Sequence, residues 1–132
     1  MFEVEVFGRA PNVPSVAETV RLCRLVVESA GIPDGHLAIE YVDAERIARL
    51  NAEHRGEAGP TDVLSFPIDG AEAGDGTERE LGDVVICAEH TEEVSEAIVH
   101  GVLHLLGFDH ETDAGEMLAL QVRLLREARE DD

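Results

Sequence analysis

The segment HGVLHLLGFDH, at residues 100–110, places three of the chain's six histidines within eleven residues. On a helix, His100 and His104 lie on one face, because residues four apart are neighbours along the helix surface. Gly107 can end that helix in a left-handed conformation, which lets the chain fold back and bring His110 to the same point. Three neutral imidazoles with one open position describe a catalytic zinc site. The segment therefore predicts a helix that ends at Gly107 and one zinc ion bound by His100, His104 and His110.

A histidine pair at this spacing is weak support for a metal, because such pairs also occur on helix surfaces and in satisfied cores. The full HxxxHxxGxxH spacing is more specific, since it matches the zinc ligands of the metzincin proteases. Those proteases carry a glutamate base directly after the first histidine and a methionine turn downstream. Here Gly101 takes the position of the base, and Met117 stands too close to His110. The pattern favours a metal site and leaves a zinc peptidase as the weaker hypothesis.

Four segments have the pattern of β-strands. Residues 2–9 and 36–42 alternate apolar and polar side chains, as half-buried strands do. Residues 81–88 form a short apolar strand. Residues 63–68 form another, in which Pro67 cannot donate to a ladder, so this strand is expected at the edge of a sheet.

Four helices are expected between and after these strands, at residues 15–30, 43–54, 91–106 and 113–128. Their expected N-caps are Ser15, Asp43, Thr91 and Asp113. The expected inner stripe of the first helix is Val16, Val20, Cys23, Val27 and Ala30. Strands and helices do not alternate strictly, which predicts an α+β fold with a small mixed sheet in a single domain over residues 1–132. The acidic, glycine-rich residues 69–80 are expected to be the most mobile internal segment.

Charge is the unusual feature of the composition. The chain has 29 acidic residues against 10 basic ones, all of them arginine, and a formal net charge of −19. Such a surface repels a nucleic acid at long range, although salt screens the repulsion. Cys23 and Cys87 belong to no CxxC pair and are expected to be buried free thiols in a reducing compartment. The sequence has no apolar run long enough for a membrane span and no basic N-terminal region typical of a secretory signal. The chain is therefore expected in the cytoplasm with no membrane partner.

Three segments together resemble a known family. They are HGVLHLLGFDH, RGEAGPTDVLSFP (55–67) and LGDVVICAE (81–89), and they occur in the order found in the YbeY-type bacterial endoribonucleases, the rRNA maturation factors. The resemblance extends from Ile47 to Leu125. It implies a single-domain α+β fold related to the zincin metalloproteases.

The resemblance also implies a function. It implies a single-strand-specific, metal-dependent endoribonuclease that acts in rRNA maturation, notably at the 3′ end of the small-subunit rRNA, and in ribosome quality control. The three histidines of the family's zinc site correspond to His100, His104 and His110, with one zinc ion per chain, and an arginine implicated in activity corresponds to Arg55. The implied partners are an rRNA precursor and the small ribosomal subunit, not DNA. The chain departs from the family's usual residues at His54, which precedes that arginine, and at Phe108, where tyrosine is common.

Several residues carry more than one interpretation. Taken alone, Arg55 is a loop arginine in a weak surface ion pair, whereas the resemblance favours contact with a phosphate. Glycine at position 101 is interpreted as avoiding a carboxylate, which would repel a phosphate. It also leaves room for a bulky backbone to approach. Asp109 could orient a ligand histidine or cap a turn, and Asp62 and Ser65 are expected in capping and ladder roles.

The remaining histidines, His36, His54 and His90, are expected to be solvated. Two other functions stay open beside the endoribonuclease. One is a zinc peptidase with a relocated base, and the other is a non-catalytic ribosome-associated factor whose metal stabilises the fold. Three histidines also suit nickel, copper or iron, so the sequence does not fix the metal.

Overall fold

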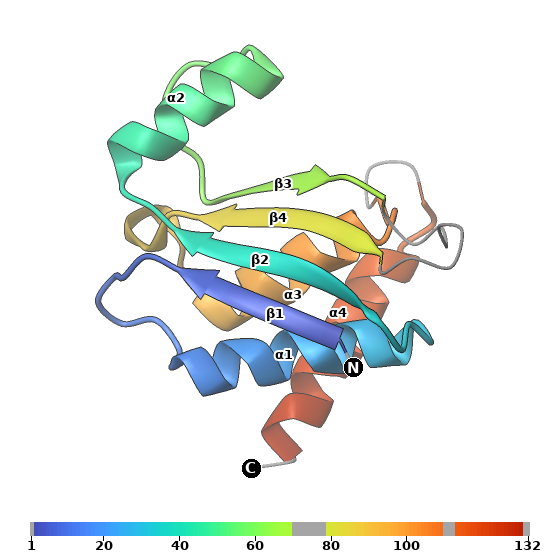
Figure 1. Ribbon diagram of the computed structural model, residues 1–132. Coiled ribbons are helices and arrows are strands. Elements are labelled where there is room, and N and C mark those ends of the chain that lie inside the picture. The colour runs from blue at the N-terminus through green and yellow to red at the C-terminus, as the bar shows by residue number, and fades with distance from the viewer. Residues whose placement is uncertain (1, 70–78, 110–112, 131–132) are drawn as a thin grey trace.

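The structure is a computed structural model and describes residues 2–69, 79–109 and 113–130. Four strands form one mixed sheet in the order β1–β2–β4–β3 (Figure 1). Strands β1 (Phe2–Phe7), β2 (Gly35–Tyr41) and β4 (Glu80–Ile86) run parallel, while β3 (Val63–Pro67) pairs antiparallel with β4 at an edge. The edge position of β3 is the one predicted from its proline, which has no backbone N–H to donate to a further strand.

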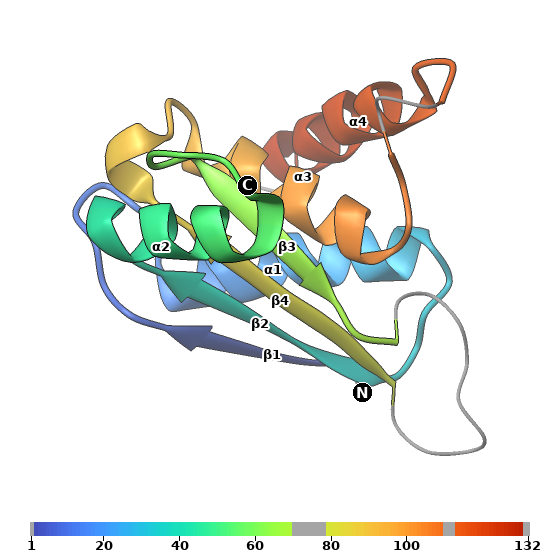
Figure 2. The same cartoon turned by 90° about the horizontal axis from the view of Figure 1, so that it is seen from above.

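Helices cover the two faces of the sheet unequally. Helices α1 (Val16–Ser29), α3 (Val94–Leu105) and α4 (Glu116–Glu130) lie on one face, and α2 (Ala44–Arg55) lies on the other side near β3 (Figures 1 and 2). A 3₁₀ turn (Ala88–His90) joins β4 to α3. The α+β class and the four-stranded mixed sheet expected from the sequence are confirmed.

The core is built around α3, which packs against β3, β4, α1 and α4. Its buried apolar residues occupy most of the helix circumference, unlike those of an amphipathic surface helix. They are Val94, Ala97, Ile98, Val99, Val102, Leu103 and Leu105. Because neighbours enclose α3, its rotation is fixed, and so are the directions in which its histidines point.

Two predicted N-caps are confirmed by hydrogen bonds. The Ser15 hydroxyl accepts from the Glu18 amide at 3.1 Å, and the Asp43 carboxylate accepts from the Arg46 amide at 2.8 Å. These bonds satisfy backbone donors at the first turns of α1 and α2.

The predicted start of α3 is wrong. This helix begins at Val94, and the Thr91 hydroxyl donates instead to the Cys87 carbonyl at 2.7 Å, because the 3₁₀ turn occupies the preceding residues. Ahead of α4, the Asp113 carboxylate accepts from the Met117 amide at 2.9 Å, so Asp113 caps the chain near its predicted position although the helix begins at Glu116.

The buried face of α1 is rotated about the helix axis relative to the predicted inner stripe. Val16 is 63% exposed, whereas Thr19 is fully buried and its hydroxyl lies 3.1 Å from that of Tyr41. A threonine satisfied by a tyrosine can occupy a core position that apolar periodicity alone assigns to valine. The buried residues of α1 are Thr19, Leu22, Cys23, Val26 and Val27.

Both cysteines are buried and free, as predicted. Burial raises the pKa of the Cys23 thiol, which keeps it protonated and unreactive. Across the described ranges, every helix is too short or too polar to cross a bilayer. Most of the segment expected to be mobile, residues 70–78, lies outside the described residues.

Candidate metal centre and cleft

Helix α3 brings His100 and His104 together at a cleft. Their Nε2 atoms lie 3.1 Å apart, and the ring centroids lie 4.7 Å apart. A zinc ion binds imidazole nitrogen at about 2.0–2.1 Å, so both Nε2 atoms can reach one ion with small side-chain movements. The spacing read from the sequence therefore places the two imidazoles as expected.

The second nitrogen of each ring faces an oxygen atom. The Nδ1 atom of His100 lies 2.8 Å from Oε1 of Gln121 on α4, and Nδ1 of His104 lies 2.9 Å from the Phe108 carbonyl oxygen. Sequence reasoning missed Gln121, although one signal was available. Gln121 interrupts the apolar stripe of α4 between Met117 and Leu124, and it is buried.

Gly107 ends α3 in the conformation that the sequence predicts. Its φ is +99°, and its amide donates to the His104 carbonyl while the Phe108 amide donates to the Leu103 carbonyl. This pair of bonds is a Schellman motif, in which a left-handed residue turns the chain away from the helix axis. The turn places the Phe108 carbonyl against the His104 ring. His110, the third expected ligand, lies outside the described residues.

The interpretation of Gly101 needs correction. A Cβ atom built at this position would lie 2.4 Å from Cγ1 of Val84 and 3.4 Å from the Ser65 hydroxyl oxygen. The position therefore faces the sheet, where a side chain has no room, and does not face a substrate. Glycine lets α3 lie close against β4, and the Gly101 carbonyl accepts from the Ser65 hydroxyl at 3.0 Å. Close packing, not the repulsion of a phosphate, explains this glycine.

Arg55 shares a cleft with both described histidines. The hollow, of about 800 Å³, is lined by Arg55 and His54 from the end of α2, by β3 and by His100 and His104 from α3. The guanidinium of Arg55 lies 3.5 Å from the Glu57 carboxylate, and its side chain is 48% exposed. Arg55 thus has the surface ion pair expected of it and also lines the same cleft as the imidazoles.

A second hollow, of about 380 Å³, continues past His100. It shares Asp62, Val63 and His100 with the first hollow and extends to Leu118 and Glu96. The two hollows therefore adjoin each other beside His100.

Two acidic residues of the cleft, Asp62 and Asp109, make local hydrogen bonds. The Asp62 carboxylate accepts from the Val63 amide at 2.8 Å, which agrees with its expected capping role. Asp109 lines the cleft, and the Asp113 amide donates to its backbone carbonyl at 3.1 Å.

His36 is not solvated as expected. Its ring lies partly buried on β2, with Nδ1 2.8 Å from a Glu80 carboxylate oxygen and Nε2 bonded to Glu5. Partial burial lowers the pKa of His36, but the hydrogen bonds and charges of Glu80 and Glu5 outweigh it and raise the pKa above 6.5. The side chain of Asp83 also titrates at a raised pKa, because burial and the nearby Glu80 disfavour its charge.

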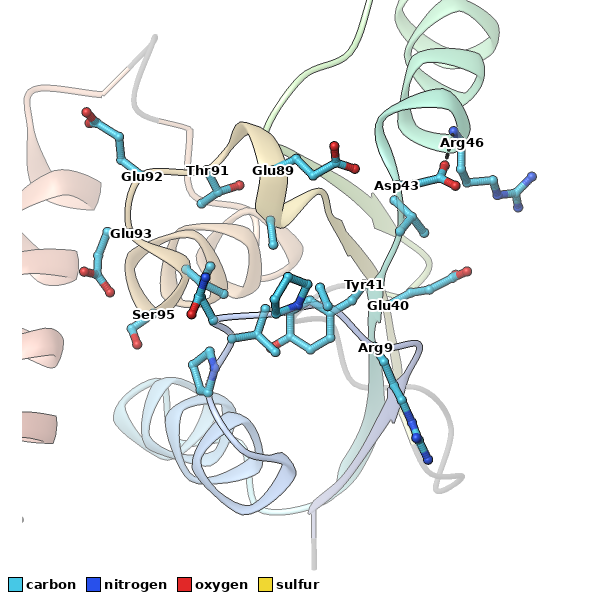
Figure 3. A pocket seen from close by; sticks show the side chains of 18 residues that line it. Arg9, Glu40, Tyr41, Asp43, Arg46, Glu89, Thr91, Glu92, Glu93 and Ser95 are labelled. Atoms are coloured by element: carbon cyan, nitrogen blue, oxygen red, sulfur yellow. Dashed lines mark hydrogen bonds between the residues drawn. The ribbon is translucent and has the colours of Figure 1, made fainter.

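A larger hollow, of about 1190 Å³, lies at the carboxyl ends of the parallel strands and has no histidine in its lining. Figure 3 shows the residues that line it, with Arg9 and Arg46 pointing outward. Its acidic residues are Glu40, Asp43, Glu89, Glu92 and Glu93. Open α/β sheets often bind ligands at this end, but five carboxylates disfavour a phosphate ligand. The imidazole cleft is therefore the better candidate for phosphate chemistry.

The described residues fit a zinc ion in part. Within the described ranges, no three histidine, cysteine or acidic side chains form a metal-binding group. The two imidazoles nevertheless direct one nitrogen of each ring to a common point and hold the other against an oxygen, as metal-ligating histidines usually do. This donor arrangement suits zinc.

Comparisons with known proteins identify the family of this chain. The sequence model of the family described as Endoribonuclease YbeY matches residues 15–129. The chain belongs to this family. Among the curated Endoribonuclease YbeY proteins, that of Beutenbergia cavernae is 38% identical and covers 92% of this chain and 93% of its own. That of Kineococcus radiotolerans is 37% identical over 90% of this chain and 79% of its own.

A solved structure supports the fold of this YbeY family member. The solution structure of a Thermotoga maritima protein matches with a TM-score of 0.58 at 23% sequence identity, over 97% of this chain and 90% of that chain. The resemblance read from the three sequence segments is confirmed by the family match.

Proposed function

We propose that this protein is a zinc-dependent endoribonuclease that cleaves single-stranded RNA during rRNA maturation. Endoribonuclease activity follows from membership of the Endoribonuclease YbeY family. The observation that carries the finer proposal is the cleft that Arg55 from α2 lines together with His100 and His104 from α3. A cation-binding pair and a phosphate-binding side chain thus face the same space.

We assign His100 and His104 as zinc ligands, and His110 as the third on its sequence spacing. A zinc ion held by these residues would supply an acidified water molecule and a Lewis acid for a phosphoryl oxygen. The imidazoles supply neutral nitrogen donors, and their hydrogen bonds to Gln121 and Phe108 fix their orientation. Phosphoryl transfer depends mainly on positioning and charge neutralisation, so the absence of a glutamate at position 101 is compatible with this chemistry.

Arg55 is assigned to the substrate phosphate. A guanidinium can donate to two phosphate oxygens at once and neutralise charge as it develops. The competing ion pair with Glu57 is long and about half exposed, so exchanging it for a phosphate costs little. Arg55 would hold the scissile phosphate on the open side of the imidazole pair.

An aromatic pair beside Arg55 supports a single-stranded substrate. The rings of His54 and Phe66 meet edge to face with centroids 4.7 Å apart, and both line the cleft. Unpaired bases stack on exposed aromatic rings, whereas bases inside a duplex are already stacked. The cleft therefore favours RNA whose bases are free.

The acidic surface affects how the RNA arrives. With a net charge of −19, long-range attraction cannot recruit RNA to this protein. We propose that the rRNA precursor is presented in the cytoplasm by the small ribosomal subunit, so that Arg55 acts only at contact distance. Raising the salt concentration should then slow cleavage less steeply than for a basic nuclease.

The direct test measures cleavage of a single-stranded rRNA fragment and of casein by the purified protein, with and without a zinc chelator. The proposal expects RNA cleavage that the chelator stops and added zinc restores, with casein intact. Casein cleavage without RNA cleavage would indicate the peptidase. A folded His104→Ala variant that still supports rRNA maturation would indicate the non-catalytic factor and overturn the proposal.

A further inference from the structure

Gln121 is a buried polar residue whose amide joins two helices. It is 6% exposed on α4, and both ends of its amide contact α3. Its Oε1 atom lies 2.8 Å from Nδ1 of His100, and its Nε2 atom donates to a Glu96 carboxylate oxygen at 3.3 Å. Glu96 and His100 are four residues apart on α3, so one amide spans both side chains.

The Glu96 contact determines which way the amide points. An ionised carboxylate can only accept hydrogen bonds, so the NH₂ group of Gln121 must face Glu96. The carbonyl oxygen of Gln121 then faces His100 and can only accept. His100 therefore carries its proton on Nδ1, and its Nε2 keeps a lone pair.

His104 has the same tautomer for an independent reason. Its Nδ1 faces the backbone carbonyl of Phe108, which can only accept a hydrogen bond. With both Nδ1 protons so placed, neutral His100 and His104 each keep a lone pair on Nε2, and these two atoms lie 3.1 Å apart. Two lone pairs at this distance repel each other unless a cation binds both, so the arrangement suits a shared cation.

A reversed amide would produce the opposite result. With the NH₂ group of Gln121 toward His100, Nδ1 would accept and Nε2 would carry the proton. That proton could be donated to Nε2 of His104, and the two imidazoles would then hydrogen-bond to each other in place of binding a metal. The same reversal would place the Gln121 oxygen against the Glu96 carboxylate, where two acceptors repel.

We propose that Gln121, oriented by Glu96, is a positioning residue that keeps His100 in the tautomer able to bind a metal ion. The inference deepens the zinc site of the proposed function and rests on it for its purpose. The tautomer itself is a property of the protein that requires neither zinc nor RNA.

The test is ¹⁵N NMR of the imidazole nitrogens in the metal-free protein, with zinc affinity measured by competition with a chelator. Wild-type His100 should show a protonated Nδ1. In Gln121→Leu, which has no amide, His100 should shift to a protonated Nε2, and zinc affinity should fall about 10- to 100-fold. Val122→Ala is the matched control, because Val122 is the neighbouring residue on α4 and is 55% exposed; it should match wild type.

Two variants at Glu96 test the orienting contact and also serve if Gln121→Leu does not fold. Glu96→Gln still offers an oxygen to the Gln121 NH₂ group and should retain the wild-type tautomer and affinity. Glu96→Met offers none, so the amide can reverse, and zinc affinity should fall by a smaller factor than in Gln121→Leu.

A protonated Nε2 on wild-type His100 would overturn the inference, whatever the protein does to RNA. Equal zinc affinity in Glu96→Gln and Glu96→Met, together with an unchanged tautomer, would also overturn it. Failure to cleave RNA with the expected tautomers present would overturn the proposed function and leave the positioning role intact.

Discussion

The imidazole pair in the cleft and His36 on the sheet are held in contrasting ways. His36 lies on the sheet face opposite α1, with a carboxylate at each ring nitrogen, from Glu80 and from Glu5. His100 and His104 have neutral oxygens at Nδ1, an amide and a backbone carbonyl. Two carboxylates favour an imidazolium with both nitrogens protonated, whereas a neutral acceptor orients the ring and leaves Nε2 for a metal.

The contrast teaches that partner chemistry, more than burial, separates a structural histidine from a candidate ligand. His36, His100 and His104 are all partly buried. Only the pair on α3 has acceptors that allow an unprotonated nitrogen at a shared point.

The sharpest way to break the comparison is to remove one histidine from each region. His104→Ala should lose zinc and roughly 100- to 1000-fold of the RNA cleavage rate, because metal catalysis contributes several kcal/mol. His36→Ala should keep both. Zinc content by elemental analysis and cleavage rate on a single-stranded RNA would decide, and equal losses in the two variants would refute the distinction.

The second-largest effect concerns Arg55, which lines the cleft together with His100 and His104. Arg55→Ala should reduce RNA cleavage roughly 10- to 100-fold, since hydrogen bonds to a charged group contribute about 1.5–3 kcal/mol. Zinc content should be unchanged. Arg49→Ala, at an exposed position on the same helix, is the matched control and should retain activity. Loss of zinc in Arg55→Ala would make Arg55 a structural residue.

A third substitution tests how far the positions of His100 and His104 depend on the close packing of α3 against β4. Gly101→Ala places a Cβ atom 2.4 Å from Val84, so one of the two must move. Overpacking of this kind costs about 1–3 kcal/mol of the free energy of unfolding, measured by urea denaturation. Ser95→Ala, on the first turn of the same helix, should change stability by less than about 0.5 kcal/mol. Unchanged stability in Gly101→Ala would contradict the packing explanation.

The smallest effect is the pH dependence that His36 contributes. Its pKa is raised in the folded protein, so the ion pairs with Glu5 and Glu80 stabilise the fold fully below pH 6.5, the ordinary pKa, and this stabilisation disappears as pH rises through the folded value. Both carboxylates are more than a third exposed, so solvent limits the gain to about 0.5–1 kcal/mol. His36→Gln should therefore be less stable than wild type at pH 5 and equal to it at pH 9. A difference that grows toward high pH would contradict this assignment.

Much of the fold was predictable because its signals are local. Ser15 and Asp43 cap helices through bonds to residues three positions away, and Pro67 restricts its strand to an edge. Predictions failed where a distant partner decided the outcome. Thr91 bonds to the turn after β4 and not to α3, and Thr19 enters the core because Tyr41, on another element, satisfies its hydroxyl.

The sequence by itself determined the spacing of His100 and His104, the glycine that ends their helix and the family to which the chain belongs, because these depend on residues near one another in the chain. Only the tertiary structure decided which atoms surround them. It placed Arg55 in the same cleft, Gln121 against His100 and Val84 against Gly101, and each of these arrangements joins segments that are distant in sequence. Such contacts depend on how α2, α4 and β4 pack around α3, which no local pattern encodes.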